Sequence, residues 1–311
     1  MLRRRNYQIS VKSADTKYTI EVKDCVLGMR GLPEDSVDLV VTSPPYNLGI
    51  KYKKYEDNKS RQEYLDWCRE WARGIKRVLK PGGSFFLNVG ASPSDPLMPH
   101  ELIIALLSED VGFRLQNTFH WIKSISVHTR QGEELSVGHF KPINSKRFVN
   151  DCHEFIFHLT RAGDVILDRL AVGVQYSDKS NINRWSHTKG RDKRCRGNNW
   201  FIPYETIVNR VKDRPHPATF PVALAVNCIK VHGCDSKSVM LDPFLGIGHS
   251  AVAAKECGIG HFIGFDIDED YLSVARWAIF GAPDAATVEA HKKTVKTWKG
   301  NDGEKLLFET P

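Results

Sequence analysis

The chain has 311 residues, 41% of them hydrophobic and 26% charged, which suits one large globular domain or a domain with a sizeable insertion. No apolar run approaches the roughly 20 residues of a membrane helix, and the basic residues 1–6 lack the apolar segment of a signal peptide. The net charge of +7 favours an anionic partner, and seven scattered cysteines without a Cys-x-x-Cys pair argue against structural zinc and for reduced thiols.

The first half of the chain alternates strand and helix patterns. Period-2 alternation and short apolar runs predict strands, and apolar residues three and four apart predict helices. Strands are expected at 7–11, 18–22, 37–41, 84–90, 117–122 and 153–159, and helices at 26–29, 60–79 and 99–110. A turn is expected over Lys80-Pro81-Gly82-Gly83. Because the two patterns alternate, the sheet is predicted to be largely parallel.

Two stretches interrupt this alternation. Residues 125–150 and 161–200 are polar, basic and poorly periodic, and they flank the strand expected at 153–159. Periodicity returns near 217, where helices are expected at 218–232, 249–257 and 269–280 and strands at 238–241 and 261–265. The chain closes with a charged tail, residues 284–311.

The run Thr42-Ser43-Pro44-Pro45-Tyr46-Asn47 follows the strand expected at 37–41. Each proline fixes φ and removes an N–H donor, and the residue before each proline is held extended. The result is a stiff loop of hydrogen-bond acceptors beside an aromatic ring. Such a loop is suited to gripping a planar base by its amino group.

A glycine turn, Asp242-Pro243-Phe244-Leu245-Gly246-Ile247-Gly248, joins an expected strand to an expected helix. Glycine lets the backbone approach a ligand closely, and Asp266 lies 24 positions after Asp242, at the end of the next strand, where it suits two ribose hydroxyls. Two cofactors fit, because Gly246-x-Gly248-x-x-Ala251 also matches a loose dinucleotide fingerprint. Asp242 would repel a pyrophosphate but pair with an amino-acid ammonium, which favours S-adenosylmethionine over a nicotinamide cofactor.

Together these runs resemble the amino-group DNA methyltransferases. Ser43-Pro44-Pro45-Tyr46 is similar to their motif IV, the glycine turn to motif I, and residues 216–221 to motif X. Weaker matches to the same family occur at 79–85, 121–123, 153–156 and 199–203. The catalytic motif precedes the basic stretches and the cofactor motif follows them, which is the order of the β group.

The resemblance implies a fold and a division into domains. The fold is expected to be α/β, with a doubly wound, mostly parallel, Rossmann-like sheet and an irregular basic target-recognition insert. Residues 1–124 and 201–283 would form the catalytic and cofactor domain, with 151–160 as a further core strand. Residues 125–150 and 161–200 would form the target-recognition region.

The resemblance also assigns residues to roles. Ser43 through its side chain and Pro44 through its carbonyl would accept from the target amino group, Tyr46 would stack on the base, and Pro45 and Asn47 would complete the loop. The residues expected to bind S-adenosylmethionine are Asp24, Cys25, Ala218, Thr219, Phe220, Asp242, Pro243, Phe244, Gly246, Gly248 and Asp266. The residues expected to contact DNA are Arg184, Lys189, Arg191, Lys193, Arg194 and Arg196.

The expected reaction is direct methyl transfer to the N4 amino group of a flipped cytosine, because Ser-Pro-Pro-Tyr leans to cytosine within the family. Adenine N6 remains the alternative, since both bases present a similar amino group. Methylation at cytosine C5 is excluded because no cysteine follows a proline. A methyltransferase acting on RNA or protein, or a nucleotide-binding dehydrogenase or regulator, stays open. The implied partners are double-stranded DNA and a cognate restriction endonuclease, in a prokaryotic cytoplasm at the nucleoid, with a monomer and a homodimer both allowed.

Overall fold

The computed structural model describes residues 8–13, 16–50, 52–128, 134–138, 145–184, 186–203 and 219–281. The predicted cofactor residue Ala218, the first half of the motif X stretch and the tail 284–311 lie outside these ranges. Among the helices in them, none combines the length and the apolar character that crossing a membrane requires.

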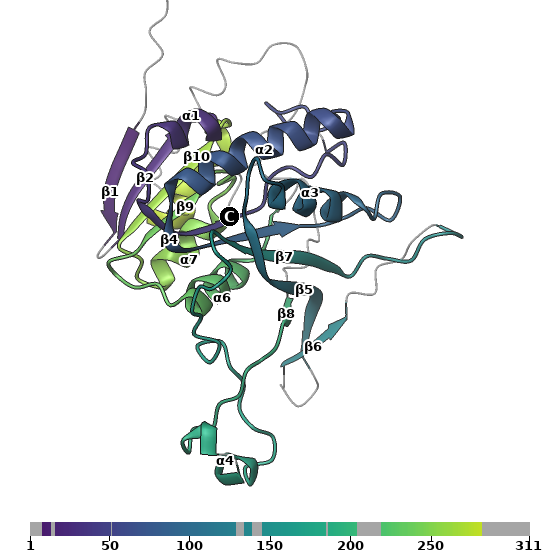
Figure 1. Ribbon diagram of the computed structural model, residues 1–311, viewed down its shortest axis with the longest axis vertical. Helices are drawn as coiled ribbons and strands as arrows, with labels where there is room; N and C mark the ends of the chain where they lie inside the picture. The colour runs from purple at the N-terminus through teal and green to yellow at the C-terminus, as the bar shows by residue number, and fades with distance from the viewer. Residues whose placement is uncertain are drawn as a thin grey trace, which may run out of the picture.

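The described strands form one mixed sheet (Figure 1). Its order is β1 (Gln8–Ser13), β2 (Thr16–Val22), β10 (His261–Asp266), β9 (Val239–Asp242), β3 (Val37–Thr42), β4 (Leu79–Val89), β7 (His153–Thr160), β5 (Arg114–His128) and β6 (Glu134–Gly138). β8 (Asn199–Pro203) pairs with β5 off this path. The five strands from β2 to β4 are mutually parallel, whereas β1, β7 and β6 run antiparallel to their neighbours.

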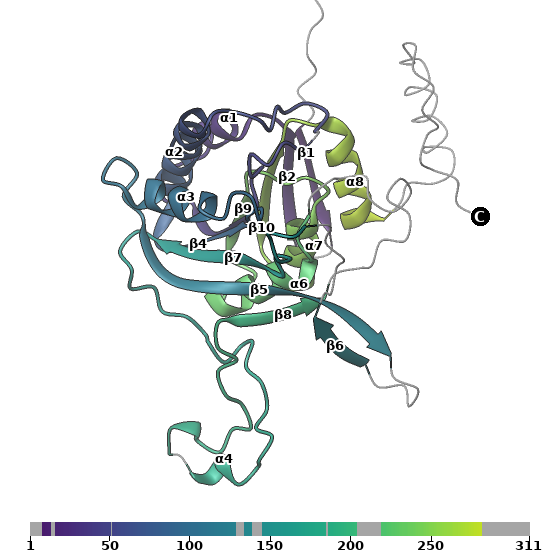
Figure 2. The same cartoon turned by 90° about the vertical axis from the view of Figure 1, so that its right-hand side faces the viewer.

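Helices cover both faces of the sheet (Figure 2). α1 (Cys25–Arg30), α2 (Arg61–Val78) and α3 (Met98–Leu107) pack on one face, and α6 (Val222–His232), α7 (His249–Glu256) and α8 (Glu269–Phe280) on the other. Side chains of a strand alternate between faces, so Leu39 and Val41 join the core under α6 to α8 while Val40 joins the core under α1 to α3. The predicted doubly wound α/β fold is therefore confirmed.

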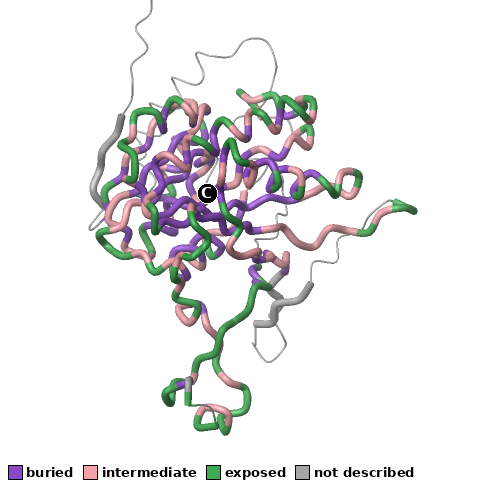
Figure 3. The backbone as a smooth tube through the Cα atoms, in the orientation of Figure 1, coloured by how far each residue is buried: buried purple, intermediate pink, exposed green. Residues whose placement is uncertain are grey.

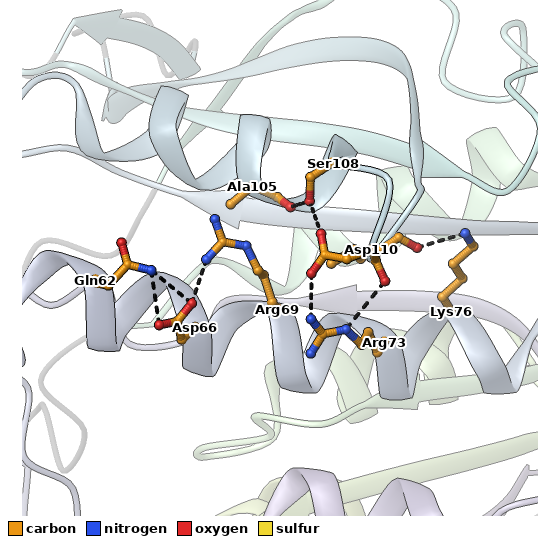
Figure 4. Close-up of polar contacts among 9 residues, drawn as sticks. Gln62, Asp66, Arg69, Arg73, Lys76, Ala105, Ser108 and Asp110 are labelled. Carbon is orange, nitrogen blue, oxygen red and sulfur yellow. Dashed lines mark hydrogen bonds and ion pairs between the residues drawn. The ribbon is translucent and has the colours of Figure 1, made fainter.

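The helix α2 begins at a capping box, in which the Ser60 side chain accepts from the Glu63 N–H and the Glu63 side chain accepts from the Ser60 N–H. Farther along, its exposed flank is tied to the turn after α3 (Figure 4). Arg73 Nη2 lies 2.5 Å from Asp110 Oδ2, and Lys76 Nζ donates to the carbonyl of Val111 at 2.7 Å. These bonds fix α2, whose Tyr64 hydroxyl donates to the Pro45 carbonyl at 2.9 Å.

Two sequence predictions are corrected here. The turn expected at 80–83 is instead part of β4, which begins at Leu79 and accommodates the glycines through a register shift opposite Val37 and Leu39. Residues 80–83 have no partner on β3 and form an irregularity between the pairs Val37–Leu79 and Leu39–Ser84. The strand expected at 117–122 extends over Arg114–His128, because its end pairs with β6. Both β6 and the end of β5 lie within the stretch 125–150, which was expected to be irregular.

Most of the stretch 161–200 leaves the sheet as a lobe (Figures 1 and 3). It carries only a short helix, α4 (Asn181–Arg184), and one 3₁₀ turn, η1 (Ser186–Thr188), and most of its residues are exposed. Val174 and Arg194 close its neck by exchanging two backbone hydrogen bonds, at 2.8 and 3.0 Å. The lobe projects well away from the helical layers.

Candidate active site

The Pro-Pro loop, residues 42–47, and the glycine turn meet at one cavity. They follow β3 and β9, which are adjacent parallel strands, so both loops leave the same edge of the sheet. The cavity is lined by Ser43, Pro44, Pro45 and Tyr46 from the first loop and by Pro243 to Gly248 from the second. Segments 200 residues apart in sequence thus form one site.

Tyr46 is anchored at the cavity wall by its hydroxyl. The ring is only 9% exposed, and the hydroxyl lies 2.6 Å from Ser43 Oγ and 3.1 Å from Glu154 Oε2. Asn88 Nδ2 donates to the same hydroxyl at 2.9 Å. Burial, followed by the nearby Glu154 charge, raises the pKa of Tyr46 well above its ordinary value, so the phenol keeps its proton. The network fixes the ring, and its stacking on a base stays a prediction.

The backbone after Tyr46 is held by a buried carboxylate, Asp57. Its oxygens accept from the N–H groups of Asn47, Leu48 and Ile50, at 2.9, 3.1 and 3.0 Å. Asn47 itself does not line the cavity. It adopts a left-handed φ of 58° and exchanges two side-chain hydrogen bonds with the Lys59 backbone, which closes the loop 47–59. The predicted supporting role of Asn47 thus has a geometric basis.

Asp242 needs a correction. It is 1% exposed and is not among the residues that line the cavity. Its carboxylate accepts from Thr42 Oγ1 and Ser250 Oγ, each at 2.5 Å, and from the N–H of Phe244. Burial raises the pKa of Asp242 to about 6. Asp242 therefore shapes the glycine turn and ties it to β3, instead of facing an amino-acid ammonium.

The glycines of this turn have the conformations that the sequence suggested. Gly246 and Gly248 have φ values of 53° and 88°, which disfavour side chains. A Cβ on Gly248 would lie 2.7 Å from the Cβ of Ala275, so this glycine also allows α7 to approach α8. Both glycines line the cavity, together with Pro243 and Phe244.

Asp266 lies at the cavity, as predicted. Its carboxylate accepts from the N–H groups of Gly246 and Asp268, both at 2.8 Å. Burial raises the pKa of Asp266 to about 6. The cavity wall also includes four further residues predicted to bind the cofactor: Asp24, Cys25, Thr219 and Phe220. Asp24 caps α1 by accepting from the N–H of Val26 and Leu27.

Sequence reasoning missed two groups of residues. The first is an aromatic wall, in which Tyr52, Tyr55 and Trp67 line the cavity. The second is polar and comprises Asn88 and Glu154, which reach Tyr46 from β4 and β7. An acid and an amide inside otherwise apolar strands were the available signal, because such groups need buried partners.

The six basic residues predicted to contact DNA all lie in the exposed lobe and its neck. Two of them also have partners within it: Arg196 Nε donates to the Val172 carbonyl at 2.8 Å, and the Arg194 guanidinium lies 5.8 Å from the centre of the Tyr176 ring. All six residues are exposed: Arg184, Lys189, Arg191, Lys193, Arg194 and Arg196. The structure does not bring any of the six to the cavity wall.

Comparison with known proteins identifies the family. Residues 37–276 match the family model N6_N4_Mtase, described as DNA methylase. The chain belongs to this DNA methylase family. It is 28% identical over 285 residues to the Type II methyltransferase M.BglII from Bacillus subtilis, covering 88% of this chain and 71% of that protein. It is 31% identical over 259 residues to M.ScaI from Streptomyces caespitosus, covering 79% and 76%.

Solved structures agree with the fold of this methylase. The PvuII DNA methyltransferase (cytosine-N4-specific) has a TM-score of 0.64 at 19% identity and covers 90% of this chain and 93% of its own. The M1.HpyAVI–SAM complex has a TM-score of 0.53 at 17% identity and covers 85% and 99%. The family model matches residues 37–276, from β3 into α8, and this range includes both loops of the cavity.

Proposed function

We propose that this DNA methylase transfers a methyl group from S-adenosylmethionine to the N4 amino group of cytosine in duplex DNA. The observation that carries the proposal is one cavity lined by both Ser43-Pro44-Pro45-Tyr46 and the Gly246–Gly248 turn. The PvuII enzyme, similar in fold, is named as cytosine-N4-specific, which favours cytosine over adenine.

The described residues fit S-adenosylmethionine. Gly246 and Gly248 line the cavity without side chains, so a ligand can approach the backbone of the turn. Asp266 presents a carboxylate that suits ribose hydroxyls. Asp24, Thr219 and Phe220 would complete the binding surface. When bound, the sulfonium supplies an activated methyl group. The rest of the reaction depends on what the protein does with the base.

The protein's contribution is positioning. The amino lone pair of cytosine is conjugated into the ring and is a poor nucleophile. Ser43 Oγ and the Pro44 carbonyl, both in the cavity wall, would accept from the amino hydrogens and aim the lone pair at the methyl carbon. The target base must leave the helix to enter the cavity. Holding the two reactants aligned supplies a large part of the rate.

The basic side chains of the lobe are suited to binding duplex DNA. Lys and Arg side chains neutralise phosphates and hold a protein on DNA, and some reach base edges. The six exposed basic residues Arg184, Lys189, Arg191, Lys193, Arg194 and Arg196 would serve this purpose. Duplex DNA outcompeting structured RNA in a binding assay would support this substrate over RNA.

The test is product analysis. Unmethylated duplex DNA is incubated with the protein and isotope-labelled S-adenosylmethionine, then digested to nucleosides. We expect label in N4-methylcytosine from the wild type, and none from Pro44→Ala, which should still bind the cofactor. Label in N6-methyladenine would transfer the proposal to that base. Label in no base would refute the proposed reaction altogether.

A further inference from the structure

We propose that Glu154 receives the proton that the target amino group gives up, and that Ser43 and Tyr46 conduct it there. The proposal rests on the proposed amino-group methylation. It adds an acidic residue from a strand on which sequence reasoning placed no catalytic role. The three side chains form a continuous hydrogen-bonded path from the cavity wall: Ser43 Oγ to Tyr46 Oη is 2.6 Å, and Tyr46 Oη to Glu154 Oε2 is 3.1 Å.

The direction of the path follows from counting protons. The Tyr46 hydroxyl has one proton and three acceptors within reach: Ser43 Oγ, Glu154 Oε2 and, at 3.2 Å, the Asn88 carbonyl. A carboxylate is the strongest acceptor of the three, so Tyr46 donates to Glu154. Ser43 must then donate to Tyr46. Asn88 Nδ2 approaches Ser43 Oγ at 3.4 Å, so this arrangement leaves one lone pair of Ser43 available to the cavity that Ser43 lines.

Glu154 is held in place at the far end of the path. Asn88 Nδ2 donates to Oε2 at 2.7 Å, and Lys123 Nζ lies 2.9 Å from Oε1. The side chains of Glu154 and Lys123 are 13% and 26% exposed, whereas the Tyr46 residue is buried. Glu154 therefore connects a buried hydroxyl to the protein surface, from which solvent can remove the proton.

The steps balance in atoms and charge. As the bond between the amino nitrogen and the methyl carbon forms, the carbon–sulfur bond breaks and its electron pair stays on sulfur. The nitrogen gives its proton to Ser43 Oγ, Ser43 gives its own to Tyr46 Oη, and Tyr46 gives its own to Glu154 Oε2. Serine and tyrosine end neutral, and the positive charge of the cofactor is cancelled at Glu154.

An internal acceptor matters because the reacting base fills the cavity. A positive charge left on the methylated nitrogen would be costly in a site from which water is excluded. Water cannot take the proton from the nitrogen there. A preformed chain of three groups removes the charge as it develops, which is general base catalysis through two hydroxyls.

The experiment compares Glu154→Gln and Tyr46→Phe with wild type in single turnovers on duplex DNA, in H₂O, D₂O and mixtures of the two. Tyr18→Phe is the matched control, because its hydroxyl is also buried and donates to the Ala251 carbonyl away from the cavity. Cofactor affinity, measured by calorimetry, reports correct folding of each variant. None of these substitutions removes a predicted contact to S-adenosylmethionine.

We expect both relay variants to bind the cofactor normally and to methylate on the order of 100-fold more slowly. Wild type and Tyr18→Phe should be slower in D₂O, with a curved dependence on deuterium content because several protons move together. The two relay variants should lose this curvature. Variants that keep the wild-type rate, or slow down with the curvature intact, would refute the relay alone. A wild type that methylates no base would refute the proposed function, and the relay with it.

Discussion

Thr42 Oγ1 donates a hydrogen bond to Asp242 Oδ1 across 2.5 Å and 200 positions of sequence. The bond joins the last residue of β3, where the Pro-Pro loop begins, to the last residue of β9, where the glycine turn begins. Both side chains are buried, at 0% and 1% exposed. The two loops of the cavity are thereby fixed to each other before any ligand enters.

Thr42→Val should test this link. Valine keeps the shape of threonine but leaves the buried carboxylate of Asp242 one donor short, which should cost about 1.5–3 kcal/mol of the free energy of unfolding. Urea denaturation monitors the loss. Thr118→Val, a partly buried threonine on β5, serves as the control and should change stability far less. An unchanged midpoint for Thr42→Val would mean that the bond contributes nothing net.

Asp57→Asn should loosen the loop that carries Tyr46. An amide offers one oxygen, and its NH₂ group opposes backbone donors, so the three N–H groups that Asp57 now accepts from cannot all be satisfied. We expect weaker cofactor binding, since Tyr52 and Tyr55 on this loop line the cavity, together with slower methylation. Asp66→Asn, on the exposed side of α2, is the matched control. Cofactor affinity equal to that of the control would show that the loop does not depend on Asp57.

Cofactor affinity should fall as the pH drops below about 6. Burial raises the pKa of Asp266 to about 6, so the carboxyl becomes protonated there and loses acceptor capacity for ribose hydroxyls. Above that pH the carboxylate is present and binding is strongest. Calorimetric titrations with S-adenosylmethionine measure the effect. They should run from about pH 5, one unit below the transition, to about pH 8, two units above it. Asp266→Asn should bind weakly at every pH, with a flatter profile.

Sequence periodicity was sufficient for much of the fold. Apart from Asp38 and His261, the runs 37–41 and 261–265 contain only apolar residues and glycine, as is typical of strands buried on both faces. It missed the start of β4, because Pro81, Gly82 and Gly83 have a local preference for a turn and yet lie within the strand, as an irregularity between the pairs Val37–Leu79 and Leu39–Ser84. The pairing on either side of these residues, at Leu79 and from Ser84 onward, cannot be predicted from a local pattern.

The same division applies to the site. Loops with restricted backbones, such as Ser43-Pro44-Pro45 and Gly246–Gly248, can be recognised locally, and both line the cavity. Glu154 could not be assigned a role in this way, because its partner Tyr46 lies 108 positions away. Asp242 was misplaced for a related reason: whether a carboxylate at a strand end faces a ligand or the core depends on neighbours such as Ser250.

A histidine pair, His158 buried and His232 partly buried, should contribute less to stability as the pH falls. Ser84 Oγ lies 2.9 Å from both His158 Nε2 and His232 Nδ1, and burial lowers the pKa of His158 to about 3 and also lowers that of His232. The unfolded chain takes up a proton on His158 below about pH 6.5, and the folded chain does so only near pH 3. The contribution of His158 to stability should therefore be present above pH 6.5 and fall toward pH 3, by about 1.4 kcal/mol per pH unit at most.

Denaturation midpoints between pH 4 and 7 measure this slope. His158→Asn should reduce it, because asparagine does not titrate. Asp242 and Asp266 act in the opposite direction, since burial raises the pKa of each to about 6 and the folded state then binds their protons first. A wild-type slope no larger than that of His158→Asn would exclude the histidine as its source.

The lobe should set the salt dependence of DNA binding. Each phosphate that a lysine or arginine neutralises releases counterions, so log K falls against log salt by about 0.9 per contact. Replacing Lys189, Arg191 and Lys193 by Gln should weaken binding at low salt and reduce the slope by about 2–3 if all three contact phosphates. Methylation measured at saturating DNA should change little, because these side chains lie outside the cavity wall.

The control replaces Lys17, Lys230 and Lys237 by Gln, which removes the same charge from the body of the protein. A slope reduced equally by both triple variants would mean that overall charge, not the lobe, holds the duplex.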